Sequence, residues 1–214
     1  HQKNDWVRGS CRYGIIPANG LIYSTPTPCN CYQTVLLKGF NALGDALPPT
    51  PEKNVLEKGP AYGSIGDDRS SVSVGAGDWP TLRGNVAREV STTATPDPTL
   101  RRRWSRALGG KLTQPIVVGD RLYVASRETC TLFALDTTSG EVLYRHVAPA
   151  EIDSPPTFFG GQLLFGCRDG WVYSIRAADG QLAWRFRAAP TDRQIVSYGR
   201  LQSSWPVIGT VLVL

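Results

Sequence analysis

The sequence predicts an all-β fold, a partial β-propeller made of four-stranded antiparallel blades. Turn-forming residues are abundant, because 22 glycines and 16 prolines occur among the 214 residues, and this composition favours many turns and short strands. The chain also repeats itself at an interval of 40 residues, which is clearest at the aromatic residues Trp104, Tyr144 and Trp184. A repeat of about 40 residues that contains four short strands is typical of a propeller blade.

Further pairs of similar residues share this offset of 40, and they are Pro115 and Pro155, Leu132 and Val172, Phe133 and Tyr173, Leu135 and Ile175, and Gly140 and Gly180. Leu122 and Leu163 lie 41 residues apart, so one residue is inserted in a turn of the second copy. A helical repeat would need apolar residues at a spacing of about three to four. The chain shows no such segment, so the repeat indicates blades of strands.

The first complete repeat is expected to form strands over residues 114–118, 121–126, 131–135 and 142–146. Apolar and polar residues alternate in "RLYVAS" and "TLFALD", which is the pattern of a strand with one buried face. The second repeat follows from "EIDSPP" onward, and a third copy begins at "SSWPVIGTVLVL". Ahead of the first repeat, "LRRRWSRAL" is expected to form one more strand.

Composition divides the chain into three parts. Residues 78–214 are expected to hold the blades, two of them complete and their neighbours partial. Residues 47–77 have the Pro-, Gly- and Ser-rich composition of a linker or a long surface loop. Residues 1–46 are interpreted as a degenerate blade-like segment, because "IIPANGLIYS" is similar to "IVVGDRLYVAS". The chain begins without Met and ends on an apolar run, so we expect an internal part of a longer protein.

Three of the five cysteines, Cys11, Cys29 and Cys31, lie in the first of these parts. Cys29 and Cys31 have the spacing C-x-C, which differs from the C-x-x-C of common zinc sites, and His1 is the nearest histidine. A disulfide from Cys11 to either Cys29 or Cys31 is therefore the better hypothesis if the compartment is oxidising. In the chain-entropy model a loop of this length, once closed, is worth about 3 kcal/mol.

Charge and hydropathy argue against two classes of partner. The net charge is +5, but the positive residues are scattered apart from "RRRW" at residues 101–104, whereas a nucleic-acid-binding domain would cluster them on one face. No apolar run approaches the roughly 20 residues that a membrane-spanning helix needs. We therefore expect no nucleic-acid partner and no membrane span in this chain.

The stretch "ALDTTSGEVLY", residues 134–144, resembles the A-x-D-x-x-T-G-x-x-x-W signature of the propellers related to pyrroloquinoline-quinone (PQQ) dehydrogenases. "DWPTLRGN", residues 78–85, is similar to the segment that opens many bacterial propellers of this type. Relatives in this group include enzymes and the lipoprotein propeller of the outer-membrane β-barrel assembly machinery. The resemblance implies the fold, but a fold shared by enzymes and scaffolds does not imply one function.

The second copy, "SIRAADGQLAW", keeps the glycine and the final aromatic residue of the signature and loses its Asp, which is replaced by Arg176. In the first copy the final aromatic is Tyr144 where the signature has Trp, and Ser139 stands where it has Thr. Both copies keep the glycine and the aromatic residue, which indicates a role in turn geometry and packing. A catalytic role of the Asp is not indicated, because the second copy lacks it. The positions concerned are therefore interpreted as structural.

Each retained residue has a physical role. Gly140 and Gly180 are placed where a tight hairpin requires a positive φ, and Asp136 can accept hydrogen bonds from backbone amides of its own turn. The resemblance implies that Trp104, Tyr144 and Trp184 end outer strands and dock one blade on the next; one large aromatic side chain buries about 150–250 Å².

A quinone-dependent dehydrogenase needs an Asp base and oxygen ligands for a bound calcium ion. No such constellation is recognisable, and Asp153, in "IDSPP" ahead of an inner strand, is the one carboxylate that we expect could face the central channel. The sequence thus favours a non-catalytic binding or scaffold module without a cofactor, with a protein partner or small ligand on a propeller face. The resemblance implies that the module is periplasmic or belongs to the bacterial cell envelope. The alternative is part of a PQQ- and calcium-dependent dehydrogenase whose catalytic residues lie in other blades.

Overall fold

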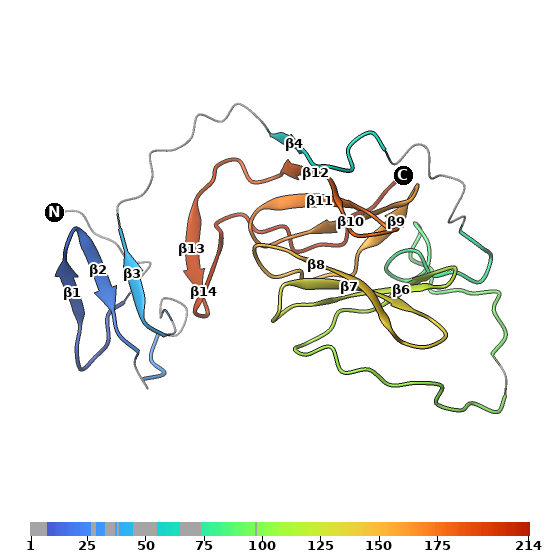
Figure 1. Ribbon diagram of the computed structural model, residues 1–214, viewed down its shortest axis with the longest axis horizontal. Coiled ribbons are helices and arrows are strands. Elements are labelled where there is room, and N and C mark those ends of the chain that lie inside the picture. Colours follow the sequence, from blue (N-terminus) through green and yellow to red (C-terminus); the bar gives the residue numbers. More distant parts are fainter. Residues whose placement is uncertain are drawn as a thin grey trace. The chain divides into compact units, whose positions relative to one another are not determined.

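The computed structural model describes residues 8–26, 29–32, 37, 39–44, 55–64, 74–96 and 98–214. Its regular elements are antiparallel β-strands in four sheets (Figure 1), which confirms the predicted all-β class. The chain divides into two units, one made of residues 1–53 with 190–204 and the other of residues 54–189 with 205–214. In the part of the chain described, no helix is long and apolar enough to cross a membrane.

The first blade is a sheet with the strand order β5-β6-β7-β8. Its strands are β5 (Ile116–Val118), β6 (Arg121–Ser126), β7 (Thr131–Asp136) and β8 (Val142–Val147). These bounds lie within two residues of those that the alternating pattern predicts. The register between β7 and β8 shifts by one residue between Ala134 and Leu135, which is a β-bulge.

The second blade repeats the first and adds a strand. Its own strands are β9 (Thr157–Phe159), β10 (Gln162–Gly166), β11 (Trp171–Arg176) and β12 (Leu182–Arg187). Its bulge, between Ser174 and Ile175, lies 40 residues after the bulge of the first blade. The two blades therefore share the position of their β-bulge as well as the order of their strands.

The added strand is β4 (Leu56–Lys58), which pairs antiparallel with the outer edge of β12. It lies inside the segment 47–77 that the composition indicated as a linker or long loop. Backbone hydrogen bonds continue on both sides of it, from Arg187 N to Val55 O (2.7 Å) and from Gly59 N to Ala183 O (2.8 Å). A three-residue strand is too short for a periodic signal, so composition alone could not reveal it.

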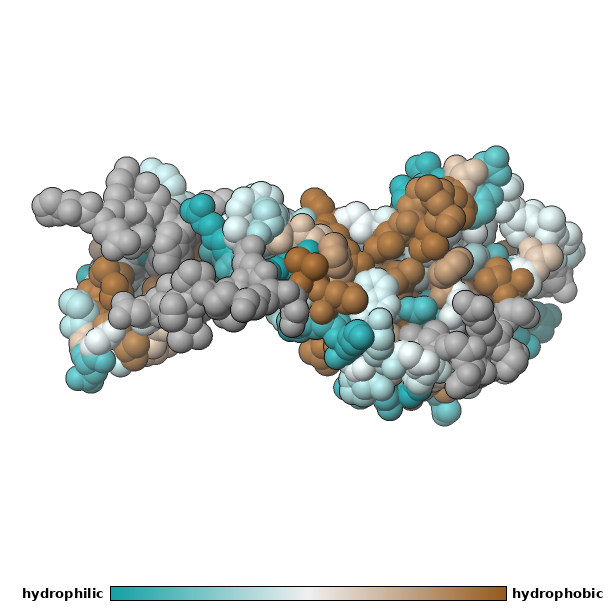
Figure 2. Space-filling view, turned by 90° about the horizontal axis from the view of Figure 1, so that it is seen from above, coloured by the Kyte–Doolittle hydropathy of each residue, from teal (hydrophilic) through white to brown (hydrophobic). Residues whose placement is uncertain are grey.

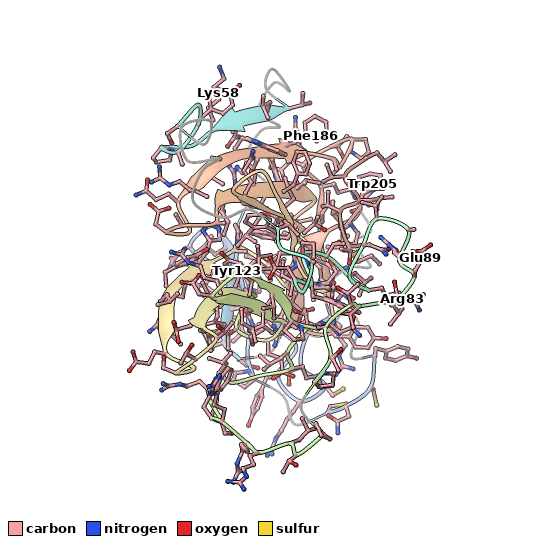
Figure 3. All side chains as sticks on the ribbon, turned by 90° about the vertical axis from the view of Figure 1, so that its right-hand side faces the viewer. Lys58, Arg83, Glu89, Tyr123, Phe186 and Trp205 are labelled. Atoms are coloured by element: carbon pink, nitrogen blue, oxygen red, sulfur yellow. The ribbon has the colours of Figure 1, made fainter. Side chains whose placement is uncertain are left out.

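The core lies between the two blades and is formed by the faces that they turn to each other. Its largest fully buried side chains include Tyr123, labelled in Figure 3, and Phe165. Phe165 stacks on Tyr173 with ring centroids 5.4 Å apart and an interplanar angle of 7°. Stacked aromatic pairs of this kind contribute beyond the area that they bury.

Two segments flank this pair of blades without forming strands. The sequence predicts a strand over residues 100–108, but in the structure these residues form no strand and join none of the four sheets. Leu108 from this segment still packs on Val124, Phe133 and Leu135 of the first blade. On the second blade, Val207 N donates to Cys167 O (3.1 Å) at the start of the third sequence copy.

The segment "DWPTLRGN" runs along the inner edge of the blades. Trp79 and Val117 of β5 exchange two backbone hydrogen bonds, of 2.7 and 3.0 Å. Phe158 N of the second blade donates to Pro80 O (2.8 Å), and Thr81 Oγ1 lies 3.0 Å from Thr157 Oγ1. One short segment thus ties together the inner strands of both blades.

The other unit contains a three-stranded sheet, β1 (Ile15–Ala18), β2 (Leu21–Ser24) and β3 (Asn41–Leu43), and a hairpin of β13 (Gln194–Ser197) and β14 (Arg200–Ser203). Asn19 and Gly20 form the β1–β2 turn with φ of 52° and 76°, as a two-residue hairpin turn requires. The hairpin β13–β14 accounts for the residues that delay the third sequence copy. The interpretation of residues 1–46 as a degenerate blade stays a prediction.

Candidate functional site

The most distinctive geometry of the repeat is the contact between an aromatic ring and the glycine of a hairpin turn. Gly140 follows β7 with a φ of +70°, and a Cβ atom added there would lie 2.5 Å from the ring of Trp104. Trp104 Nε1 donates to Thr137 O (2.9 Å), and Arg106 Nε donates to Gly140 O (2.9 Å). The ring of Trp104 therefore packs directly on the turn, at a distance that leaves no room for a Cβ atom, so the turn requires glycine.

The same contact recurs between the two blades. The ring of Tyr144, on β8, lies 2.6 Å from the position that a Cβ atom of Gly180 would take, and Gly180 has a φ of +76°. Tyr144 Oη donates to Ala177 O (2.8 Å), and His146 Nδ1 lies 3.0 Å from Gly180 O. All four residues of this contact stand 40 positions after their counterparts in the first one. The counterparts of Tyr144, Gly180, Ala177 and His146 are, in this order, Trp104, Gly140, Thr137 and Arg106.

The carbonyl oxygen of Ala177 is the polar centre of this contact. Besides Tyr144 it accepts hydrogen bonds from Arg121 Nη1 (3.0 Å) and from Tyr123 Oη (3.2 Å), so three side chains of the first blade converge on this atom of the second. Burial raises the pKa of Tyr123 to about 12 and raises the pKa of Tyr144 further. Both phenols are therefore neutral donors at any physiological pH.

His146 is held in its neutral form at the same interface. Burial lowers its pKa below the usual value, and this outweighs the opposing effect of the hydrogen bond to Gly180 O. Since a carbonyl oxygen can only accept, the neutral ring carries its proton on Nδ1. The ring also packs edge-on against Phe165, with centroids 6.0 Å apart, so its role here is in packing.

The turns themselves are stabilised differently in the two copies. Asp136 Oδ1 accepts from Thr138 N (2.8 Å) and Ser139 N (2.7 Å), and these bonds hold the pKa of the carboxyl below its usual value. In the second copy Arg176 pairs with Asp179, whose Oδ1 accepts from Gln181 N (3.1 Å). Asp179 stands where the first copy has Ser139, whose Oγ accepts from Glu141 N (3.2 Å), and Arg176 positions the carboxylate.

Trp184 is the third member of the aromatic series and has a different environment. It packs against Ala61, beside β4, and against Ala183 of its own strand. Together with Leu56, Tyr62, Val172 and Phe186 it lines an apolar pocket of about 320 Å³. Phe186, on β12, stands 40 residues after His146 and is 42% exposed. Figure 3 labels Phe186 and Lys58 of β4, and Figure 2 shows apolar residues at the surface of the molecule.

Asp153 lies in a network of two carboxylates and two arginines between the blades. Its Oδ1 lies 2.6 Å from Arg127 Nε, and its Oδ2 accepts from Arg168 Nε. Glu151 Oε2 lies 3.2 Å from Arg127 Nη2 and 3.3 Å from Arg168 Nε. The Asp153 side chain is 11% exposed, and each of its two oxygens contacts an arginine. The sequence had suggested that this side chain faces the central channel.

Replacing Asp153 by Asn should therefore destabilise the fold. The substitution leaves two partly buried arginines with less compensation, and we expect the free energy of unfolding to fall by about 2 kcal/mol, which is below the range for a fully buried pair. Urea denaturation followed by circular dichroism measures this loss. Glu141→Gln, at an exposed side chain of the first blade, is the matched control and should change the stability by less than about 0.5 kcal/mol. Equal stabilities of the two variants would contradict a structural role for Asp153.

The three N-terminal cysteines are drawn together around Arg8. Cys11 Sγ lies 3.8 Å from Cys29 Sγ and 3.1 Å from Arg8 Nη2. The Cys31 N–H lies 3.4 Å from Cys29 Sγ, and chiefly this contact, with Arg8, lowers the pKa of Cys29 to about 6. Of the two disulfides considered from the sequence, Cys11–Cys29 would join sulfur atoms that lie 3.8 Å apart, and the pairing stays a prediction.

A calcium and quinone site would need oxygen ligands that converge on one point. Among the described residues no group of three or more His, Cys, Asp or Glu side chains is placed to hold a metal ion. Asp153 is engaged by two arginines, while Asp136 and Asp179 are engaged within their turns. No step of a quinone-dependent oxidation can be derived from these residues.

Comparison with known proteins gives one relative and several solved structures. A stretch of 83 residues is 41% identical to the DNA damage-responsive serine/threonine-protein kinase RqkA of Deinococcus radiodurans, covering 38% of this chain and 12% of that protein. The quinohemoprotein alcohol dehydrogenase of Comamonas testosteroni is 20% identical with a TM-score of 0.47, covering 57% of this chain and 21% of that one.

BamB from Moraxella catarrhalis is 21% identical with a TM-score of 0.36, covering 46% of this chain and 35% of that one. The chain thus spans well under two thirds of each of these proteins. A family model, described as outer membrane protein assembly factor BamB, matches residues 88–213, which include both complete blades and all of the docking contacts above. Because that match covers more than half of the sequence, the chain belongs to the PQQ-like propeller family that this model describes.

Proposed function

We propose that this chain is part of a non-catalytic β-propeller of the bacterial cell envelope that binds a protein partner. The observation that carries the proposal is the use of the signature residues. Tyr144 and Gly180 dock the first blade on the second, while Trp104 and Gly140 dock the preceding segment on the first blade, so all four residues are engaged in packing. The family description, an assembly factor of outer membrane proteins, supports a protein partner and an envelope location.

The state of the carboxylates supports the same proposal. A general base must be able to reach a substrate proton and accept it. Asp153 is instead paired with two arginines, and Asp136 is held as an anion by the amides of its turn. The alternative, a part of a PQQ- and calcium-dependent dehydrogenase, would have to draw its catalytic residues from outside the described blades.

The test compares two ligands on the same chain. A fluorescently labelled outer-membrane β-barrel protein, unfolded in urea and diluted into buffer, should bind the chain saturably in an anisotropy titration. An unfolded all-helical protein of similar size is the matched control and should bind at least tenfold more weakly. PQQ with calcium, titrated up to about 100 μM against tryptophan fluorescence, should give no saturable change.

Saturable quinone binding, together with dye-linked oxidation of an alcohol or a sugar, would overturn the proposal in favour of the dehydrogenase. Equal binding of the two unfolded proteins would overturn it as well, because it would show only unspecific hydrophobic association.

A further inference from the structure

The pairing of β4 with β12 shows that the outer edge of a blade in this protein accepts an added strand. Arg185 and Arg187 of β12 direct their backbone groups toward the added strand, since Arg187 N donates to Val55 O (2.7 Å) and Arg185 faces Glu57 in the register. The side chains reinforce this pairing, because Arg185 contacts Glu57 Oε2 through Nε (2.7 Å) and Nη2 (2.6 Å). A short extended segment is thus held by backbone bonds and one ion pair.

The outer edge of the first blade has the same construction. β8 stands 40 residues before β12, and in the described part of the chain no strand pairs with its outer side. Ala148 N donates inward to Cys130 O (2.8 Å), as Ala188 N of the second blade donates inward to Gly170 O. Successive residues of an edge strand direct their backbone groups alternately inward and outward. The backbone groups that point outward are therefore those of Leu143, Arg145 and Val147, like those of Arg185 and Arg187 on β12.

The side chains of β8 specify what kind of strand would fit. Arg145 is the counterpart of Arg185, its side chain is exposed, and no described carboxylate pairs with it. Leu143 and Val147 on either side of it are 49% and 65% exposed. A strand placed in the register of β4 would set one acidic residue opposite Arg145 and apolar residues toward Val147.

We propose that the outer edge of β8 binds an extended segment of a protein partner as an antiparallel strand with an acidic side chain opposite Arg145. Backbone hydrogen bonds would supply the affinity and the ion pair would fix the register. The outer edge of a blade lies at the rim of a propeller, so this surface does not depend on how many blades the whole protein has. The inference deepens the proposed function and rests on it.

The probe is a fluorescent peptide with the sequence of residues 55–62, "VLEKGPAY", which already forms such a strand on β12. It should bind the full chain saturably, and hydrogen exchange should show new protection of the amides of Arg145 and Val147. Protection confined to β12 would overturn the proposal, because the peptide would then merely have displaced β4.

A charge reversal tests the ion pair. Arg145→Glu should weaken binding of the peptide about tenfold, and a peptide carrying Glu57→Lys should restore it on that variant. Arg102→Glu changes the net charge by the same amount at an exposed site and should leave binding unchanged. Equal weakening by both variants, or no rescue by the reversed peptide, would overturn the proposal.

Two further outcomes separate this inference from the broader function. If the chain alone dimerises in sedimentation equilibrium and Arg145→Glu abolishes the dimer, the occupant is a second copy and the proposal fails. If the unfolded β-barrel protein binds but the peptide does not, the inference fails while the proposed function stands.

Discussion

Gly180→Ala is expected to lower the free energy of unfolding by about 3 kcal/mol, measured by urea denaturation with circular dichroism. Two costs combine in this substitution. The φ of +76° disfavours any residue with a Cβ atom by about 1 kcal/mol, and the new methyl group would lie 2.6 Å from the ring of Tyr144. Because Tyr144 is packed and hydrogen-bonded at the blade interface, it cannot move aside freely, and such overpacking costs about 1–3 kcal/mol.

Gly160→Ala separates these two costs. Gly160 has a φ of +54° in the turn between β9 and β10, but a Cβ atom added there would meet no atom within 4 Å. The variant should therefore lose only the conformational part, about 1 kcal/mol. Equal losses at the two glycines would show that the ring of Tyr144 does not constrain Gly180.

Tyr144→Ala is expected to cost about 3 kcal/mol, because it removes a largely buried ring from between the blades and leaves a cavity over Gly180. Tyr144→Phe keeps the ring and removes only the hydroxyl group. Ala177 O retains its bonds from Arg121 and Tyr123, so this variant should cost about 1 kcal/mol or less.

The same denaturation experiment measures both tyrosine variants, and Tyr198→Ala, at an exposed tyrosine in the turn of the β13–β14 hairpin, controls for the loss of a ring that packs on little. A Phe variant as unstable as the Ala variant would mean that the hydroxyl group, and not the ring, holds the blades together.

Much of this architecture could be read from the sequence, because a repeat exposes its own geometry. The offset of 40 residues located the strands of both blades, and the persistence of Gly140, Gly180 and the aromatic series pointed to turns and packing. These features are local or periodic, so they leave a signal in one chain.

Other features could not be read because they depend on distant partners. The three residues of β4 pair with a strand about 130 positions away, and nothing in "VLEKG" distinguishes them from a loop. Asp153 was singled out as a carboxylate near the channel, but its two arginine partners become neighbours only when the blades pack. Residues 100–108 have the pattern of a strand, yet a strand also needs an edge to pair with.

The exchange of Asp136 for Arg176 shows why the second copy still forms its turn. From the sequence, Arg176 lacks the acceptor that Asp136 provides. In the structure Asp179 takes the place of Ser139, since it accepts from Gln181 N as Ser139 Oγ accepts from Glu141 N, and Arg176 pairs with it. A compensating pair of this kind becomes visible only when both copies are compared residue by residue in space.

The central claim is that the repeated glycine and aromatic residues form a docking contact between blades, and a double-mutant cycle between Tyr144 and Gly180 tests it most directly. In the Tyr144→Ala background the methyl group at residue 180 has room, so Gly180→Ala should cost no more than Gly160→Ala does, about 1 kcal/mol. We expect a coupling energy of about 2 kcal/mol between the two sites. Strictly additive losses, with Gly180→Ala as costly without the ring as with it, would contradict the claim.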